Sequence, residues 1–471
     1  MLFNTLQYAL FFAVVFGVSW LLLGFARVRL LFLLGASYFF YACWDYRFLP
    51  LIWASSTADF LLARAIHDAR NERSRKLWLV FTVVMNLGVL GFFKYWNFGI
   101  ENVAAALGLD PASITLRVAL PIGVSFFTFE SMSYVIDVYR RELEPTDSYA
   151  EYLTFVAFFP HLVAGPIVRP RDLLPQLAKA PRFSTQLASE GLFLVAVGLL
   201  KKIVVGDYLA LNLVDRVFDA PAMYSAVEVY AGVVGYALQI YCDFSGYTDI
   251  AIGSALLLGV RFPRNFDSPY QSTDLAEFWR RWHISLSSWL RDYLYIPLGG
   301  NRHGRVRTYV NLLLTMVLGG LWHGAAWTFV VWGTLHGLGL AVHRAFREWS
   351  DRRRPARPTS LGAKLFGWVL TFHFVCAAWI YFRAATFDRA SLVFSRLGSL
   401  TTHHQNLPPA LLGVLALGLA THFLPQRWLD TTREQFGRAP AWAQGLALFA
   451  VAVALREMAA SDAVPFVYFQ F

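Results

Sequence analysis

The chain has 471 residues, of which 57% are hydrophobic, 17% are aromatic and only 15% are charged, and its formal net charge is +10. Soluble domains average about 25% charged residues, so this composition excludes a disordered chain, a collagen-like chain and an ordinary water-soluble enzyme. The three cysteines, Cys43, Cys242 and Cys376, are too few and too far apart for a disulfide scaffold or a CxxC metal site. We therefore interpret the chain as an integral membrane protein.

Apolar windows recur along the whole chain, and most are near the roughly 20 residues that a helix needs to cross a bilayer. They lie at 5–24, 28–44, 48–66, 77–93, 150–168, 190–206, 225–242, 245–260, 309–322, 325–343, 364–383, 410–424 and 440–456. The pattern predicts an all-α, polytopic transmembrane bundle over 1–471, with roughly 10–13 spans and no separate soluble domain. Met1 to Leu10 contain no Lys or Arg, so we expect a retained first helix and no cleaved signal peptide.

Clusters of basic residues predict the orientation of the bundle. Arg27 and Arg29 follow the first window, Arg64 to Lys76 follow the third, and the longest basic stretch runs from Arg344 to Arg357. The positive-inside rule places these clusters in the cytoplasm and the N-terminus on the outer side of the membrane. The net charge of +10 then mostly reflects the basic residues on the cytoplasmic side of the membrane. Attraction to anionic lipid or to an anionic cytosolic substrate is a further interpretation, and we expect no nucleic-acid partner.

The segment from Phe262 to Gly300 differs from the apolar windows around it. A turn-rich entry leads to a helix start at which Thr273 or Asp274 is expected to be the N-cap. The residues from Phe278 through Asp292 then predict one Trp-rich, basic, amphipathic helix. Its simplest interpretation is a lipid anchor without chemistry, and the alternative is a helix that packs against the bundle.

Ionisable side chains inside apolar runs are candidates for function, because placing them there is costly. His323 is the clearest case, since it follows Gly319, Gly320 and Trp322 in an apolar run. An imidazole can take a proton from a hydroxyl near pH 7, and the alternative is a histidine bonded to a neighbouring helix. His336 lies 13 residues further on, where a straight helix would place it roughly 20 Å away. The two can share a site only if the chain breaks near Gly324, so packing is the favoured role for His336.

Other polar residues give weaker signals. His283 lies in the predicted amphipathic helix, and Tyr241 opens a stretch in which Asp243 and Asp249 occur in apolar surroundings. Such carboxylates need partners and usually anchor a helix end. His161 and the pair His403 and His404 are weaker candidates still. The sequence contains no Gly-x-Ser-x-Gly elbow, Walker A motif, His-Glu-x-x-His motif or dinucleotide-binding glycine triplet.

The ordered set of motifs resembles the membrane-bound O-acyltransferase (MBOAT) family, and especially its branch that O-acetylates exported polysaccharides such as alginate. The motifs that carry the resemblance extend over nearly the whole chain, and the central ones lie at 241–249, 265–270, 278–286, 289–301 and 319–324. The resemblance implies a helical bundle with re-entrant helices around a central tunnel, and a catalytic region at about 115–345.

The resemblance also implies residue roles. His323 matches the essential histidine of the family, and His283 matches a second polar position that lines the tunnel. Acyl transfer needs a base at the attacking hydroxyl and donors for the oxyanion. We expect His323 to be the base, with Trp322, Asn301, Tyr241 and Asp243 as supporting residues. Arg280, Arg281, Arg291 and Arg302 are candidates to bind the phosphates of the donor.

The implied reaction moves an acetyl group from a cytosolic thioester, with acetyl-CoA expected as donor substrate and no bound cofactor or metal. The implied partners are membrane lipid and a periplasmic protein that modifies the polysaccharide. Transfer of D-alanine to teichoic acid and O-acetylation of peptidoglycan are alternatives within the family. A transporter is a remote alternative, since we find no inverted internal repeat.

Overall fold

The structure is a computed structural model that describes residues 1–471 except 111–113, 117–118, 354–359, 459–463 and 468–471. Every regular element of the described residues is helical, and none of them forms a strand. The predicted all-α fold is therefore confirmed. Arg354 and Arg357 of the predicted basic stretch lie outside the described residues.

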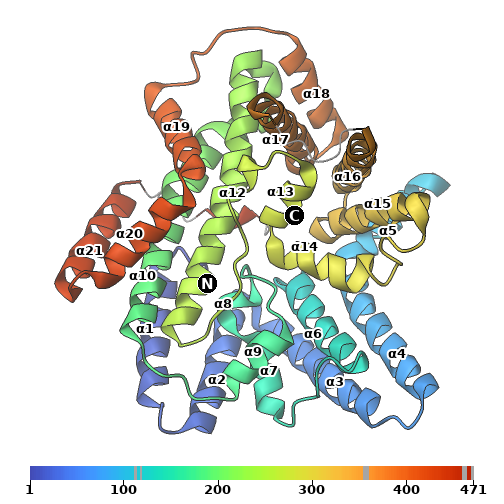
Figure 1. Ribbon diagram of the computed structural model, residues 1–471, viewed down its shortest axis with the longest axis vertical. Helices are drawn as coiled ribbons and strands as arrows, with labels where there is room; N and C mark the ends of the chain where they lie inside the picture. The colour runs from blue at the N-terminus through green and yellow to red at the C-terminus, as the bar shows by residue number, and fades with distance from the viewer. Residues whose placement is uncertain (111–113, 117–118, 354–359, 459–463, 468–471) are drawn as a thin grey trace. The chain divides into compact units, whose positions relative to one another are not determined.

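The chain forms two compact units, which are described separately. Unit 1 comprises Met1–Val195 and Thr248–Pro263, and unit 2 comprises Ala196–Tyr247 and Arg264–Phe471. Two helices have residues in both units, α10 (Thr185–Leu199) and α12 (Ala226–Leu257), so the chain passes between the units along continuous helices (Figure 1). The expectation of one integral membrane domain over 1–471 stays a prediction.

Unit 1 is built from the N-terminal helices (Figure 1). They are α1 (Leu6–Leu21), α2 (Ala26–Asp45), the 3₁₀ turn η1 (Tyr46–Phe48), α3 (Leu49–Asp68), α4 (Glu72–Leu90), the π turn η2 (Gly91–Tyr95), α5 (Trp96–Leu107), α6 (Val124–Tyr139), α7 (Tyr149–Ala157), α8 (Phe159–Leu162) and α9 (Pro170–Leu177). The residues 185–195 of α10 and 248–257 of α12 complete the unit.

Helix α6 forms the core of unit 1, since nearly all of its side chains are buried and it packs against α3 and α4. The buried Glu130 on this helix lies 2.9 Å from Nδ1 of His161 and also accepts a hydrogen bond from the amide of Val168. The weak candidate His161 is thus held in the core by a carboxylate. Gly123 precedes α6 with φ 76°, and a Cβ atom there would lie 2.5 Å from the carbonyl oxygen of Leu162.

Arg29 is buried, whereas the positive-inside rule concerns basic residues in exposed loops. Its side chain is 5% exposed and donates hydrogen bonds to Ser19 and to the carbonyl oxygen of Leu258. This guanidinium is therefore part of the core of unit 1, where a charged group requires such partners. It is a weaker marker of the cytoplasmic side than an exposed arginine.

Unit 2 contains the remaining helices (Figure 1). They are the π stretches η4 (Leu200–Asp207) and η5 (Ala210–Val214), α11 (Asp215–Asp219), the 3₁₀ turns η6 (Pro221–Met223) and η7 (Pro269–Gln271), α13 (Leu275–Arg281), α14 (Ile284–Leu290), the π turn η8 (Arg291–Tyr295), α15 (Gly304–His323), α16 (Trp327–Arg353), α17 (Leu361–Arg383), α18 (Phe387–Gly398), α19 (Pro409–Phe423), α20 (Gln426–Arg438) and α21 (Ala441–Met458). Residues 226–247 of α12 belong to this unit.

Helices α15 and α16 form a closely packed hairpin in unit 2. Glycines make the close approach possible, because a Cβ atom on Gly320 would lie 2.3 Å from the carbonyl oxygen of Phe329. A Cβ atom on Gly333 would lie equally close, 2.3 Å, to the carbonyl oxygen of Met316. Small residues at these positions let two helix backbones touch, as at many helix contacts in membranes.

A buried ion cluster fixes α12 to the start of unit 2. The ammonium group of Lys202, whose side chain is 1% exposed, lies 2.6 Å from Asp207 and 2.5 Å from Asp243. It also donates to the carbonyl oxygen of Pro465, and the amide of Val467 donates to Asp243. A buried cation needs such compensation. The cluster therefore ties the segment near the C-terminus to α12.

Within the described residues, four helical segments are long and apolar enough to cross a membrane, at Ala26–Asp68, Glu72–Leu107, Leu361–Arg383 and Ala441–Met458. The pair α19 and α20, bent by 90°, is a fifth candidate. The window 150–168, one of the two windows that are short or interrupted in the sequence, is divided between α7 and α8. The prediction of separate windows at 225–242 and 245–260 was wrong, because they form the single 32-residue helix α12. Hydropathy reports burial, and it does not report where a helix breaks.

The first prediction concerns the glycines of the α15 and α16 hairpin. Gly333→Ala should destabilise the protein by about 1–3 kcal/mol, because the added methyl group meets a backbone carbonyl that cannot move aside. Thermal unfolding in detergent, followed by tryptophan fluorescence, measures the effect. Gly413→Ala in α19 is the matched control, since nothing lies within 4 Å of a Cβ atom there. Equal melting temperatures for the two variants would contradict the described contact.

The second prediction concerns Lys202. Lys202→Met leaves Asp207 and Asp243 buried without their cation, and it should cost about 3–5 kcal/mol of stability. The triple variant that also carries Asp207→Asn and Asp243→Asn should recover part of the loss, because no uncompensated charge then remains. Unfolding midpoints of the three purified proteins decide the matter. A single variant as stable as the parent would show that the cluster does not hold the fold.

Candidate active site

His323 occupies the last position of α15, where the hairpin breaks. Gly324 follows in an extended conformation, with φ −158° and ψ 149°, and α16 begins at Trp327. A Cβ atom on Gly324 would lie 2.1 Å from the ring of Phe329, so only glycine fits at this turn. The chain thus breaks at Gly324, which is the condition under which His323 and His336 could share a site. The break leaves the His323 side chain 4% exposed at the end of the helix.

Three aromatic rings surround His323 in unit 2. The ring centroids of Trp322, Trp332 and Phe382 lie 5.0, 5.1 and 5.2 Å from that of the imidazole, each in an edge-on arrangement. Edge-on packing of this kind is favourable between aromatic rings. The three rings come from α15, α16 and α17, so the position of His323 depends on three helices.

His336 shares one of these rings. Its centroid lies 4.8 Å from that of Trp332, and its Nδ1 atom accepts a hydrogen bond of 3.3 Å from the indole of Trp279. The break at Gly324 thus lets both histidines contact the same tryptophan, although they are 13 residues apart. His336 is fully buried and sits among aromatic side chains, an environment consistent with the favoured packing role.

His283 lies where the sequence predicts a continuous helix, and that prediction was wrong. The segment forms two short helices, α13 and α14, and His283 lies between them with φ 42°. A left-handed conformation is uncommon for a residue with a side chain, although histidine is among those enriched there. The buried apolar face of the segment also excludes a lipid anchor, since Phe278, Trp282 and Leu286 are each 1% exposed.

The turn brings His283 toward the ring next to His323. Its Nδ1 atom lies 3.1 Å from Oδ1 of Asn265, which also accepts a hydrogen bond from the hydroxyl of Ser285. The imidazole packs edge-on against Phe244 at 4.7 Å and lies 6.2 Å from the Trp322 ring. Trp322 therefore contacts His323 directly and connects it to His283.

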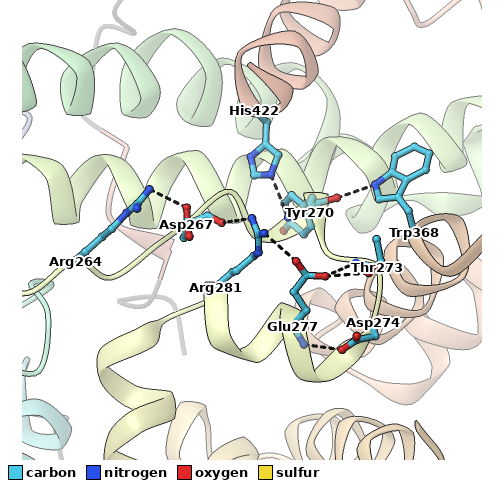
Figure 2. Close-up of polar contacts among 9 residues, drawn as sticks. All are labelled: Arg264, Asp267, Tyr270, Thr273, Asp274, Glu277, Arg281, Trp368 and His422. Carbon is cyan, nitrogen blue, oxygen red and sulfur yellow. Dashed lines mark hydrogen bonds and ion pairs between the residues drawn. The ribbon is translucent and has the colours of Figure 1, made fainter. Parts of the chain in front are cut away.

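A polar frame holds the entry to α13 in place, as Figure 2 shows. Of the two cap residues that the sequence offers, Thr273 and Asp274, the structure has Asp274 as the N-cap, and it accepts a hydrogen bond from the amide of Glu277. The Glu277 carboxylate in turn accepts a hydrogen bond from the backbone amide of Thr273 and forms an ion pair with Arg281 at 2.8 Å. Arg281 also donates to the carbonyl oxygen of Asp267. The frame fixes the two ends of α13 and thereby the turn at His283.

A second part of the frame reaches α19. The backbone amide of Tyr270 donates to Nε2 of His422 at 3.1 Å, and the indole of Trp368 donates to the carbonyl oxygen of Tyr270 (Figure 2). Tyr241 packs edge-on against His422 at 4.5 Å and against Tyr270 at 6.0 Å. The predicted supporting residue Tyr241 thus belongs to this frame. Asp243, also predicted as supporting, belongs to the Lys202 cluster.

The remaining predicted residues lie at the other end of the hairpin or are already paired. Asn301 and Arg302 are exposed just before α15, and the neighbouring carbonyl oxygen of Gly300 accepts a hydrogen bond from Asn311, which lies 12 residues, about 18 Å, before His323 along the helix. Arg291 pairs with Asp292 at 2.7 Å, whereas Arg280 is exposed. The structure therefore does not bring Asn301 to His323. The assignment of Arg280, Arg281, Arg291 and Arg302 to the phosphates of the donor stays a prediction.

Sequence reasoning missed several residues of the site. Trp332 and Phe382 contact His323, but an aromatic residue in an apolar run is indistinguishable from ordinary core. His422 and Lys202 carried a usable signal, because each is a polar residue inside a predicted apolar window. The same criterion that selected His323 would have selected them. Among the described residues, no three His, Cys, Asp or Glu side chains gather in a way that could hold a metal ion.

Comparison with known proteins places this site within a family. Residues 139–384 match the family model of MBOAT, the membrane-bound O-acyltransferase family. This range contains His283, His323 and His336, together with the aromatic rings around them. It covers more than half of the chain.

Similar proteins extend the match beyond that range. A probable alginate O-acetylase of Azotobacter vinelandii is 44% identical over 79% of this chain and 73% of the relative. A probable alginate O-acetylase of Pseudomonas aeruginosa is 42% identical over 85% of this chain and 76% of the relative. A peptidoglycan O-acetyltransferase of Helicobacter pylori is 37% identical over 79% and 74%. The chain therefore belongs to the membrane-bound O-acyltransferase family and is a multi-pass membrane O-acyltransferase.

Proposed function

We propose that this enzyme takes an acetyl group from acetyl-CoA on the cytosolic side of a bacterial inner membrane and makes it available for O-acetylation of an exported polysaccharide. A periplasmic partner protein completes the transfer to the polymer. The observation that carries the proposal is the buried His323 at the broken end of α15, in a chain whose relatives include alginate O-acetylases.

The chemistry uses His323 as a general base. The hydroxyl oxygen of the acceptor attacks the thioester carbonyl, so that a C–O bond forms and the C–S bond breaks. The hydroxyl proton passes to the imidazole and then to the departing thiolate, which leaves as the thiol of CoA. A positioned base contributes about 10²–10⁴-fold to such reactions. The rings of Trp322, Trp332 and Phe382 exclude water, which would otherwise hydrolyse the thioester.

The position of His323 supports a reaction between the two faces of the membrane. Arg305 at the start of α15 pairs with Glu348 near the end of α16, in the basic part of the hairpin. The positive-inside rule assigns this end to the cytosol. His323 lies at the opposite end of α15, next to Phe382 at the end of α17. The proposal requires a passage through which the donor reaches the imidazole from the cytosolic side.

Peptidoglycan is a second candidate acceptor, which the Helicobacter pylori relative favours. Both candidates use the same acetyl donor and the same base. They differ in the acceptor, since peptidoglycan offers the hydroxyls of amino sugars and alginate offers those of uronic acids. The greater identity to the two alginate O-acetylases leads us to favour a uronic acid polymer.

The third prediction is that His323→Ala reduces acetyl transfer by about 10²–10⁴-fold, because the attacking hydroxyl loses its base. Purified full-length protein is incubated with radiolabelled acetyl-CoA and an acceptor oligosaccharide together with the periplasmic partner. His67→Ala, at an exposed position near the end of α3, is the matched control and should retain full activity. Gel filtration verifies that both variants are folded. Transfer by His323→Ala within tenfold of the parent would remove the proposed base.

The fourth prediction concerns the donor. Labelled acetyl-CoA should support transfer, whereas a D-alanyl carrier protein should not. The two donors are compared at equal concentration with the same protein and acceptor. Label from the carrier protein and none from acetyl-CoA would reassign the enzyme to D-alanyl transfer and leave the role of His323 intact.

A further inference from the structure

We propose that a polar cavity of unit 2, remote in sequence from His323, binds a uronic acid unit of the exported polysaccharide. The proposal rests on the proposed function, because it assumes that the polymer acetylated through the partner protein is such a polysaccharide. The cavity has a volume of about 200 Å³ and lies between η6, the start of α12, the end of α18 and the loop that follows α18. We call it the Arg396 pocket. Its polar lining includes Tyr224, Glu228, Arg396, Thr401, His403 and Gln405.

The loop that closes the pocket is held in a defined conformation. Glu228 is 2% exposed, and its two oxygens accept hydrogen bonds from the backbone amides of Ser225 and Asn406, each at 2.9 Å. Thr401 accepts a hydrogen bond from the amide of Ala226 through its hydroxyl. The carboxylate of Glu228 is thus engaged with backbone N–H groups, which stabilise its charge. The pocket is therefore preformed.

Arg396 provides a cation at this pocket. Its Nε atom donates to the carbonyl oxygen of Tyr224 at 2.9 Å, and its Nη2 atom donates to the same oxygen. A guanidinium has five N–H donors, and these two contacts use one edge of it. The described contacts thus leave donors that can bind a carboxylate, the preferred partner of arginine. His403 and Gln405 are exposed at the pocket and offer ring and amide groups for hydroxyls.

The size and the lining of the pocket select the ligand class. Sites for drug-sized ligands occupy roughly 300–1,000 Å³ and are mostly apolar. This pocket is smaller and is lined mainly by charged, amide and hydroxyl groups, so it suits neither an acyl chain nor a whole coenzyme. One sugar ring that carries hydroxyls and a carboxylate matches it. Such a ring is one unit of a longer polymer, whose neighbours would extend out of the pocket.

The location supports an acceptor site. Helix α17 follows the basic stretch that the positive-inside rule assigns to the cytosol, so its last residue, Arg383, lies toward the periplasm. Arg383 pairs with Asp215 at 2.7 Å, and Arg389 on α18 donates to the carbonyl oxygen of Asp219. The elements that form the pocket are therefore connected to the periplasmic end of α17. An exported polysaccharide is present on that side.

The test measures binding of a short alginate oligosaccharide to the purified full-length protein by isothermal titration calorimetry. Arg396→Gln should raise the Kd about tenfold or more, because a charge-assisted hydrogen bond to the carboxylate is lost. His403→Ala should raise it severalfold. His404→Ala is the matched control, because the imidazole of His404 is exposed next to His403 but does not line the pocket. The Kd of this variant should equal that of the parent protein.

Two further ligands and one further variant make the outcome decisive. A carboxyl-reduced alginate oligosaccharide should bind at least about tenfold more weakly, and a chitin oligosaccharide should not compete. Equal binding of the neutral ligands, unchanged affinity in both Arg396→Gln and His403→Ala, or no binding to the parent protein would overturn the proposal. His323→Ala should bind the oligosaccharide normally. In the parent protein, oligosaccharide binding without acetyl transfer from acetyl-CoA would count against the proposed function alone, and acetyl transfer without oligosaccharide binding would count against the pocket alone.

Discussion

The close contact between α15 and α16 is the constraint on which the proposed chemistry depends. Gly320 and Gly333 let the two backbones touch, and Gly324 ends α15 where the ring of Phe329 leaves no room for a side chain. A continuous helix would hold His323 and His336 on different faces. Because the chain turns, both reach Trp332, and His323 becomes the end of a helix.

Polar groups that are buried or partly buried position the rest of the site, and each has a partner of its own. Asn265 holds His283, the Glu277 and Arg281 pair spans α13, and Lys202 connects two carboxylates to the segment near the C-terminus. None of these contacts requires a reactant. They are available before any donor arrives, so the protein does not have to order these side chains during the reaction.

The sequence allowed the fold class, the family and the central histidine to be predicted, because composition and polar residues in apolar runs report burial directly. It also identified Gly324 as the place where a break would let His323 and His336 share a site, and Thr273 or Asp274 as the cap of the next helix. The prediction from sequence was wrong at His283, where a left-handed turn divides an apparently periodic segment into two helices. It failed as well where contacts join distant residues, as for Phe382 beside His323. Periodicity describes one helix, and it does not specify which helices meet.

The left-handed backbone at His283 affects how substitutions there should be interpreted. Glycine and asparagine adopt this conformation at little cost, whereas alanine and glutamine carry a backbone penalty in addition to the lost imidazole. An alanine scan would therefore overstate the chemical importance of this side chain. Glycine or asparagine is the informative replacement, since each separates the shape of the main chain from the chemistry of the ring.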